Sequence, residues 1–259
     1  MKKAFLAVLL IATFAAVAMA ADAAKPATIA PFISVHGQQG LEPIMSSNWK
    51  VPPPAIPFCG ANCLYYGGDF NSASSAANGI CMINNGVSNC QTWVGVKPNA
   101  NASVTGGTFN SLVFQTNIGT NPTPFNVRTG MSSGKGGKSV CTTKGPATLK
   151  SKGPGGFGLP EYSYTIKKLA KACAMTSGKV YYVSIQPQYT DGASWGFLTD
   201  VEAPIKNHKG WPNLKDKGFV NYPGGSPPLS YAPLSGSTGG CGGIGCDVMS
   251  VALTGTHSN

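Results

Sequence analysis

Lys179-Val-Tyr-Tyr-Val-Ser-Ile-Gln-Pro-Gln-Tyr189 is the stretch whose pattern decides the fold class. Tyr181, Val183 and Ile185 would share one face, and the residues between them would point the other way. This period of two is typical of a strand with one buried face, and the β-branched and aromatic side chains suit such a surface. Turn-forming residues precede and follow the stretch. We therefore expect a central strand of an all-β domain here.

Further stretches along the chain carry strand signals, and turns rich in glycine, proline or asparagine separate them. They are residues 92–96, 108–118, 125–129, 139–143, 162–167, 195–199 and 246–253. A series of short strands joined by such turns is typical of a β-sandwich or jelly roll. We predict an all-β fold, an antiparallel β-sandwich with long Gly/Pro-rich loops and disulfide staples.

Residues 166–176 fit two different structures. Ile166, Leu169, Ala170 and Cys173 recur at the spacing of one helical face, and lysines lie opposite them. A short helix that ends near Gly178 and a strand both remain open, because periodicity does not separate the two over so short a run.

The first residues have the three parts of a secretory signal peptide. A basic start, Met1-Lys-Lys3, precedes an apolar run, and the small-residue site Ala18-Met-Ala20 follows it. A membrane anchor that stays attached is the alternative, but the run is short for a membrane span. We expect a secreted, extracellular protein with no membrane span in its mature chain.

Composition sets the expected domain boundaries. We expect residues 1–20 to be the signal peptide and the proline-rich residues 21–58 to be an extended lead-in. Residues 59–259 would then form a single β-sandwich domain. Within it, the glycine-rich residues 202–245 are expected to be a loop-rich excursion packed on the sandwich.

The charge balance is basic but dispersed. The chain carries 19 lysines and arginines against 9 acidic residues, and its net charge is +10. Arg128 is the one arginine, and the lysines are spread along the chain rather than gathered in a block. Nucleic-acid binders use arginine forks and clustered basic faces, so we exclude nucleic acid as a partner. Attraction to anionic cell-surface polymers is the expected consequence of this charge.

An exported chain with eight cysteines is expected to form disulfides. Spacing does not fix the connectivity, and sequential pairing is our prediction. The expected pairs are Cys59 with Cys63, Cys81 with Cys90, Cys141 with Cys173, and Cys241 with Cys246. The alternative for Cys59, Cys63, Cys241 and Cys246 is a four-thiolate zinc site, which an oxidising compartment disfavours.

Two glycine-rich motifs in one segment resemble a nucleophile elbow and a phosphate loop, but the residues in and around them do not fit either motif. Gly130-Met-Ser-Ser-Gly134 matches the nucleophile elbow with Ser132 as nucleophile, but the glycines and lysines after it do not start a helix. Gly134-Lys-Gly-Gly-Lys-Ser139 resembles a phosphate loop, but Ser132 occupies the position that needs glycine. A plain turn between two strands is the expected structure.

The remaining candidate residues are acidic or aromatic. Asp200 and Glu202 would point the same way from a strand, as an acid and base for glycoside hydrolysis or as calcium ligands. Trp195 and Trp211 are candidate platforms for sugar stacking. We assign no catalytic, cofactor-binding or metal-binding residue and expect no cofactor, and the possible calcium site lacks support.

Several turn and strand patterns together resemble a known family. They are Val127 to Val140, Gly158 to Ile166, and Gly178-Lys-Val-Tyr-Tyr-Val-Ser-Ile185. Over roughly residues 60–200 the chain resembles the exported bacterial domains called choice-of-anchor domains. The resemblance implies a β-sandwich-like module on a surface or secreted protein and no established catalytic residues. We expect no sorting tail after the domain, which would be a departure from the family pattern.

These observations favour a non-catalytic role. Our leading hypothesis is a secreted bacterial β-sandwich protein, not an enzyme, with a structural or adhesive role at the cell exterior. The alternatives are a carbohydrate-binding module that uses Trp195 or Trp211, and a secreted hydrolase, either a glycosidase or an esterase. The expected partner is a cell-surface polysaccharide or another surface protein.

Overall fold

The stretch that decided the fold class forms β10 (Tyr181–Ile185). It lies inside a six-stranded sheet, between β3 (Gln91–Val96) and β5 (Thr123–Thr129), and is antiparallel to both. Tyr181, Val183 and Ile185 are buried in the main hydrophobic core. The prediction of a central strand with this buried face is therefore confirmed.

The structure is a computed structural model, and it describes residues 60–68, 79–81, 90–113, 122–154, 160–187, 196–199, 208–222, 229–234 and 249–258. All of these residues lie in one compact unit of the chain. The expected signal peptide and proline-rich lead-in lie outside the described residues, so their boundaries stay predictions.

Two antiparallel sheets contain every strand in the described part of the chain. In the six-stranded sheet, which we call the smaller sheet, the spatial order is β14 (Leu229–Pro233), β13 (Asn213–Tyr222), β3, β10, β5 and β6 (Lys138–Gly145). The neighbouring pairs have the antiparallel registers expected of a sandwich sheet.

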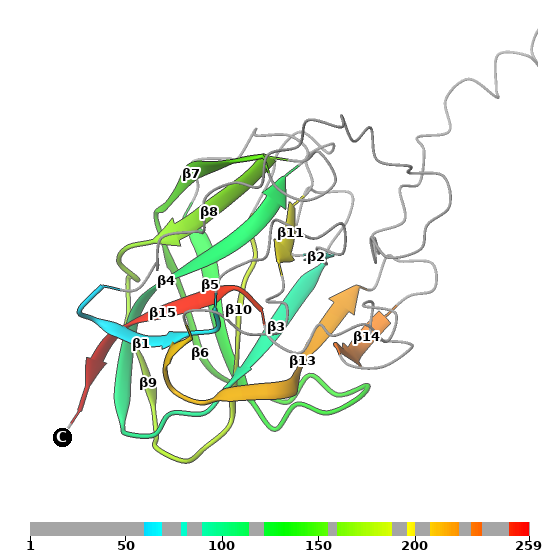
Figure 1. Cartoon of the computed structure of the whole chain (residues 1–259). Helices are drawn as coiled ribbons and strands as arrows, with labels where there is room; N and C mark the ends of the chain where they lie inside the picture. Colours follow the sequence, from blue (N-terminus) through cyan, green and yellow to red (C-terminus); the bar gives the residue numbers. More distant parts are fainter. Residues whose placement is uncertain are drawn as a thin grey trace, which may run out of the picture. The chain divides into compact units, whose positions relative to one another are not determined.

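The nine-stranded sheet, which we call the larger sheet, is arranged around one long strand, β4 (Figure 1). Its main path is β12 (Lys209–Gly210), β1 (Cys63–Tyr66), β15 (Val251–His257), β4 (Ala102–Val113), β11 (Gly196–Thr199) and β2 (Gly79–Cys81). On its second edge β4 pairs with β8 (Pro160–Ile166) and β9 (Cys173–Met175), and β8 also pairs with β7 (Ala147–Pro154).

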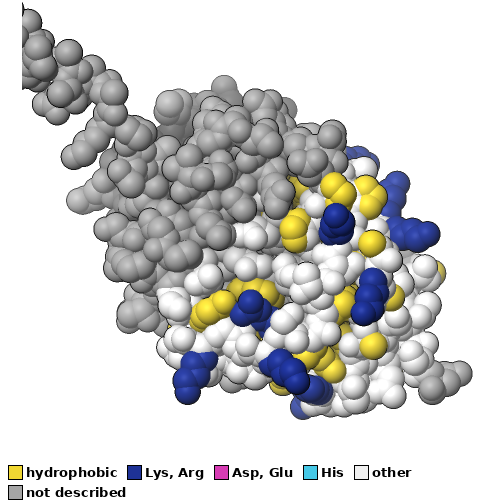
Figure 2. Space-filling model, turned by 180° about the vertical axis from the view of Figure 1, so that it is seen from behind, with side chains coloured by type: hydrophobic (Ala, Val, Ile, Leu, Met, Phe, Trp, Pro, Cys, Tyr) yellow, Lys and Arg dark blue, Asp and Glu magenta, His cyan; other side chains and the backbone are white. Residues whose placement is uncertain are grey.

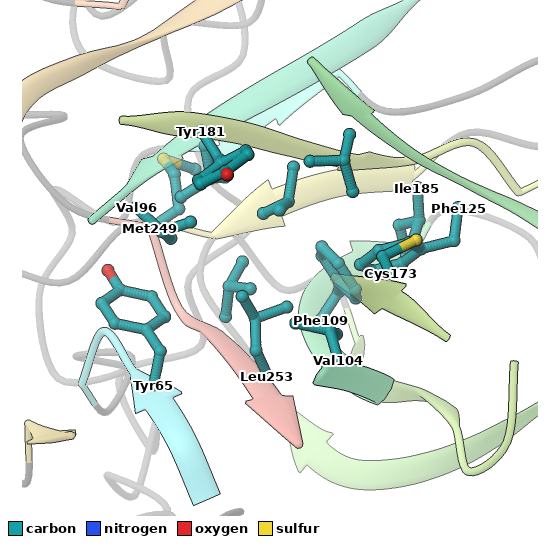
Figure 3. Packing of buried hydrophobic residues seen from close by; sticks show 14 of the residues in the cluster. Tyr65, Val96, Val104, Phe109, Phe125, Cys173, Tyr181, Ile185, Met249 and Leu253 are labelled. Carbon is teal, nitrogen blue, oxygen red and sulfur yellow. The ribbon is translucent and has the colours of Figure 1, made fainter. Parts of the chain in front are cut away.

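The core lies between the two sheets (Figure 3). Phe109 and Leu253 enter it from the larger sheet, and Phe125 and Ile185 enter it from the smaller sheet. Each of these side chains is at most 2% exposed. The fold is therefore the predicted all-β, antiparallel sandwich, and its inner faces follow the alternation seen in the sequence.

A disulfide between Cys141 in β6 and Cys173 in β9 joins the two sheets. Its Cα atoms are 5.8 Å apart, and it closes a separation of 32 residues. This is one of the four predicted pairs, and the structure confirms it.

Residues 166–176 contain no helix. The chain leaves β8 at Ile166, crosses an irregular segment and enters β9 at Cys173. The Leu169 amide donates to the Thr105 carbonyl and the Ala170 amide to the Lys144 carbonyl, each at 2.8 Å. Pairing with neighbouring strands therefore overrides the helical spacing of the apolar residues. Throughout the described residues, no helix is long and apolar enough to cross a membrane.

The late strands differ from the sequence-based expectation. The run predicted over 246–253 forms β15 from Val251 onward, and this strand lies between β1 and β4. The expected excursion at 202–245 contributes β12 to the larger sheet and β13 and β14 to the smaller one. Part of this segment therefore builds the sandwich instead of covering it.

Candidate functional site

The outer face of the smaller sheet carries a second aromatic cluster, separate from the main core. Alternation along β10 sends Tyr182 outward, and the strand register places it opposite Arg128 of β5. Phe219 of β13 pairs in the same way with Trp93 of β3. We call Trp93, Arg128, Met131, Tyr182, Phe219 and Tyr231 the outer aromatic cluster.

Arg128 lies at the centre of this cluster. Its guanidinium carbon is 4.8 Å from the Trp93 ring centroid and 5.5 Å from that of Tyr231. Its Nη1 donates hydrogen bonds of 2.9 Å to the Gly136 carbonyl and to the Tyr231 hydroxyl. Neutral groups therefore fix the position of the guanidinium, through cation–π contacts and two hydrogen bonds.

The guanidinium of Arg128 keeps unused hydrogen-bonding capacity. An arginine side chain has several N–H donors in a rigid fork, and both hydrogen bonds here come from Nη1. Among the described residues, Nε and Nη2 have no acceptor. Arg128 is half-buried, so part of it remains accessible. A guanidinium that is held in place and keeps such donors is suited to receive an anion.

The turn between β5 and β6 packs against the cluster. Met131 is only 6% exposed and contacts the aromatic side chains, and the Gly134 amide donates to the Tyr231 carbonyl at 3.3 Å. A Cβ atom at position 136 would lie 2.4 Å from both Arg128 Nη1 and Tyr231 Cζ. The turn therefore approaches Arg128 so closely that a side chain at this position would displace the guanidinium and the Tyr231 ring.

The same turn contains both glycine-rich motifs. Ser132 is exposed and forms an isolated bridge with Lys135, and β6 follows directly as an antiparallel strand. A nucleophile elbow and a phosphate loop both need a helix after the motif. The structure confirms the plain strand-to-strand turn, so Ser132 lacks the setting of a catalytic serine.

Figure 2 shows lysine and arginine side chains on one described face of the molecule. They are spread between hydrophobic patches. Within the cluster, burial raises the pKa of the Tyr182 hydroxyl, which keeps it neutral.

The predicted stacking role of Trp211 is wrong for this structure. Its side chain has 0% exposure and belongs to the main core, and its amide donates to the Leu64 carbonyl at 3.0 Å. A ring without an exposed face offers no platform to a sugar. Trp195, the second candidate, lies outside the described residues.

The other predicted cysteine pairs are only partly visible. Cys63 and Cys90 are disulfide-bonded, so Cys63 is not a thiolate ligand of the alternative zinc site. The described part of the chain contains no free cysteine and no cluster of metal-binding side chains. The candidates whose side chains lie outside the described residues are Cys59, Cys81, Cys241, Cys246, Asp200 and Glu202.

Sequence reasoning did not identify the outer aromatic cluster, although it contained one usable signal. Arg128 is the one arginine of the chain, and it alternates with Phe125 and Val127 on a predicted strand. That pattern places it on the outward face. Nothing local to the sequence indicates that Trp93 and Tyr231 come from distant strands to flank it.

Comparison with protein-family models, with curated proteins and with solved structures finds no match to this chain. The resemblance to choice-of-anchor domains therefore stays a hypothesis that rests on the turn and strand patterns alone.

Proposed function

We propose that the protein is an exported, non-catalytic β-sandwich that adheres to an acidic polysaccharide at the cell exterior. The outer face of the smaller sheet would make the contact, and Arg128 would receive a carboxylate or sulfate group of the polymer. This proposal specifies the adhesive role that composition and the N-terminal sequence favour.

The observation that carries the proposal is the setting of Arg128. Two rings, a hydroxyl and a carbonyl hold its guanidinium in place, and both hydrogen bonds come from Nη1. Its Nε and Nη2 donors match the two oxygens of a carboxylate or sulfate. The contact would be charge-assisted and partly shielded from water, which makes it stronger than a contact to an exposed lysine.

Charge recognition is better supported than ring stacking at this site. Trp93 is 1% exposed and Tyr182 is 6% exposed, so their rings serve to position Arg128 rather than to cover a sugar face. We therefore assign specificity to the acidic group of the polymer and expect neutral polymers to bind weakly.

Retention of the oxidised protein on immobilised polymers tests this proposal. We expect binding to polygalacturonate that decreases as salt is raised, and little binding to dextran. Arg128→Gln is expected to weaken binding by about ten- to a hundred-fold, the loss of a hydrogen bond to a charged group. Lys150→Gln, which removes one exposed charge from β7 of the larger sheet, is the matched control. Equal losses in the two variants would contradict the proposal.

A further inference from the structure

The larger sheet has a hollow of about 310 Å³ on its outer face, on the other side of the sandwich from the outer aromatic cluster. Its lining comes from the turn before β1, from β4, β15 and the end of β8. This volume is at the lower end of the range of small-ligand sites and suits one sugar unit.

A glycine of β4 lets neighbouring strands approach closely beside the hollow. A Cβ atom at position 106 would lie 2.5 Å from the Ile166 carbonyl oxygen and 2.9 Å from Thr254 Oγ1. Gly107, the next residue, contributes directly to the lining. Gly106 therefore allows the end of β8 and Thr254 of β15 to lie close to β4, whereas a Cβ atom at position 107 would point toward Phe109 and Leu253 in the core.

The polar groups around the hollow have spare hydrogen-bonding capacity. The hydroxyls of Thr108 and Thr165 are 3.1 Å apart, so one donates to the other and one O–H stays available. The side chains of Asn62, Thr254 and Lys167 have no hydrogen-bond partner among the described residues. Residues with hydroxyl, amide and ammonium groups thus line the same hollow.

We propose that this hollow is a second binding site, for a single acidic sugar unit such as a uronate. Lys167 would pair with its carboxylate, and Asn62 and the threonines would bind its hydroxyls. The inference rests on the proposed function for the identity of the polymer, but it concerns different residues. With one site on each sheet, a single molecule would join two polymer chains, which gives the adhesive role a mechanism.

Calorimetric titration with a short oligogalacturonate tests the second site. We expect two binding events per protein in the unmodified chain and one in either Arg128→Gln or the double variant Lys167→Gln with Thr254→Val. In the double variant, the affinity of the oligogalacturonate for the hollow is expected to fall by at least about ten-fold, because a charged and a neutral hydrogen bond are lost. Lys168→Gln with Thr256→Val changes neighbouring exposed residues outside the lining and is the matched control.

The outcomes separate the two claims. A single event that is lost in Arg128→Gln but unchanged in the double variant would overturn the second site and leave the proposed function standing. A single event that is lost in the double variant but unchanged in Arg128→Gln would support the hollow and contradict the role of Arg128. Beads coated with polygalacturonate should aggregate with the unmodified protein and with the control but with neither site variant, and aggregation by the double variant would also overturn the second site.

Discussion

Two buried tyrosines depend on keeping their protons. The Tyr65 hydroxyl donates to Asn213 Oδ1 at 3.0 Å, and the Tyr164 hydroxyl shares a 2.6 Å hydrogen bond with Thr123. Burial raises the pKa of both hydroxyls above the ordinary tyrosine value of 10.0, and for Tyr164 the Thr123 hydrogen bond opposes this shift. Both groups therefore stay neutral in the folded protein at a pH where an unfolded chain would release the protons.

We predict that the free energy of unfolding decreases above about pH 10. Below that pH both states hold the protons, so the contribution of these tyrosines is fully present there. Above it the unfolded state loses protons that the folded state retains, which costs about 1.4 kcal/mol per pH unit for each tyrosine. Urea denaturation at a series of alkaline pH values measures this slope. Tyr65→Phe should make the slope shallower by about 1.4 kcal/mol per pH unit, the contribution of one tyrosine. An unchanged slope would contradict the raised pKa of the Tyr65 hydroxyl.

Among the elements, the turn between β5 and β6 is the one on which the outer aromatic cluster depends. Gly136→Ala would force a Cβ atom into Arg128 and Tyr231. We predict a loss of about 1–3 kcal/mol in the free energy of unfolding, as for other overpacked sites, together with weaker binding to polygalacturonate.

Gly60→Ala is the matched control for the stability loss alone, because nothing lies within 4 Å of a Cβ atom at position 60, while the residue itself lines the hollow of the larger sheet. Denaturant titration of both variants separates a local clash from a general effect of alanine. Equal stability of Gly136→Ala and the unmodified protein would show that the turn does not approach Arg128 in solution.

The elements also show what local sequence patterns predict. β3, β5 and β10 have one regularly apolar face, and the sequence predicted them closely. β13 was missed because residues 215–217 interrupt its alternation with charges, and its pairing with β3 is a long-range property. Residues 166–176 have helical spacing, yet their amides bond to neighbouring strands. Pairing between distant segments is not encoded in local periodicity.

The candidate site was harder to predict than the fold, for the same reason. Alternation along β5 places Arg128 outward, but its environment comes from β3, the β5–β6 turn and β14. Trp211 shows the converse error, because an aromatic residue in a loop-rich segment was expected to be accessible and is completely buried. Composition predicts the basic character of the chain but not which basic group the fold holds against aromatic rings.

At the scale of the whole molecule, the Cys141–Cys173 disulfide ties the two sheets together. Removing a cross-link over 32 residues increases the entropy of the unfolded chain. We predict that Cys141→Ala with Cys173→Ala lowers the free energy of unfolding by about 3–4 kcal/mol. Thermal and denaturant unfolding measure this loss. A change below about 1 kcal/mol would contradict the stabilising role of this disulfide between the two sheets.

The one arginine of the chain allows the central claim to be tested directly. Protein labelled with nitrogen-15 only in arginine should give a single Nε–H signal in a two-dimensional NMR spectrum, and that signal reports on Arg128 alone. We predict that oligogalacturonate shifts this signal in a saturable way, and that a neutral oligosaccharide of the same length leaves it in place. Binding of the acidic oligosaccharide with no change in the Arg128 signal would contradict the account.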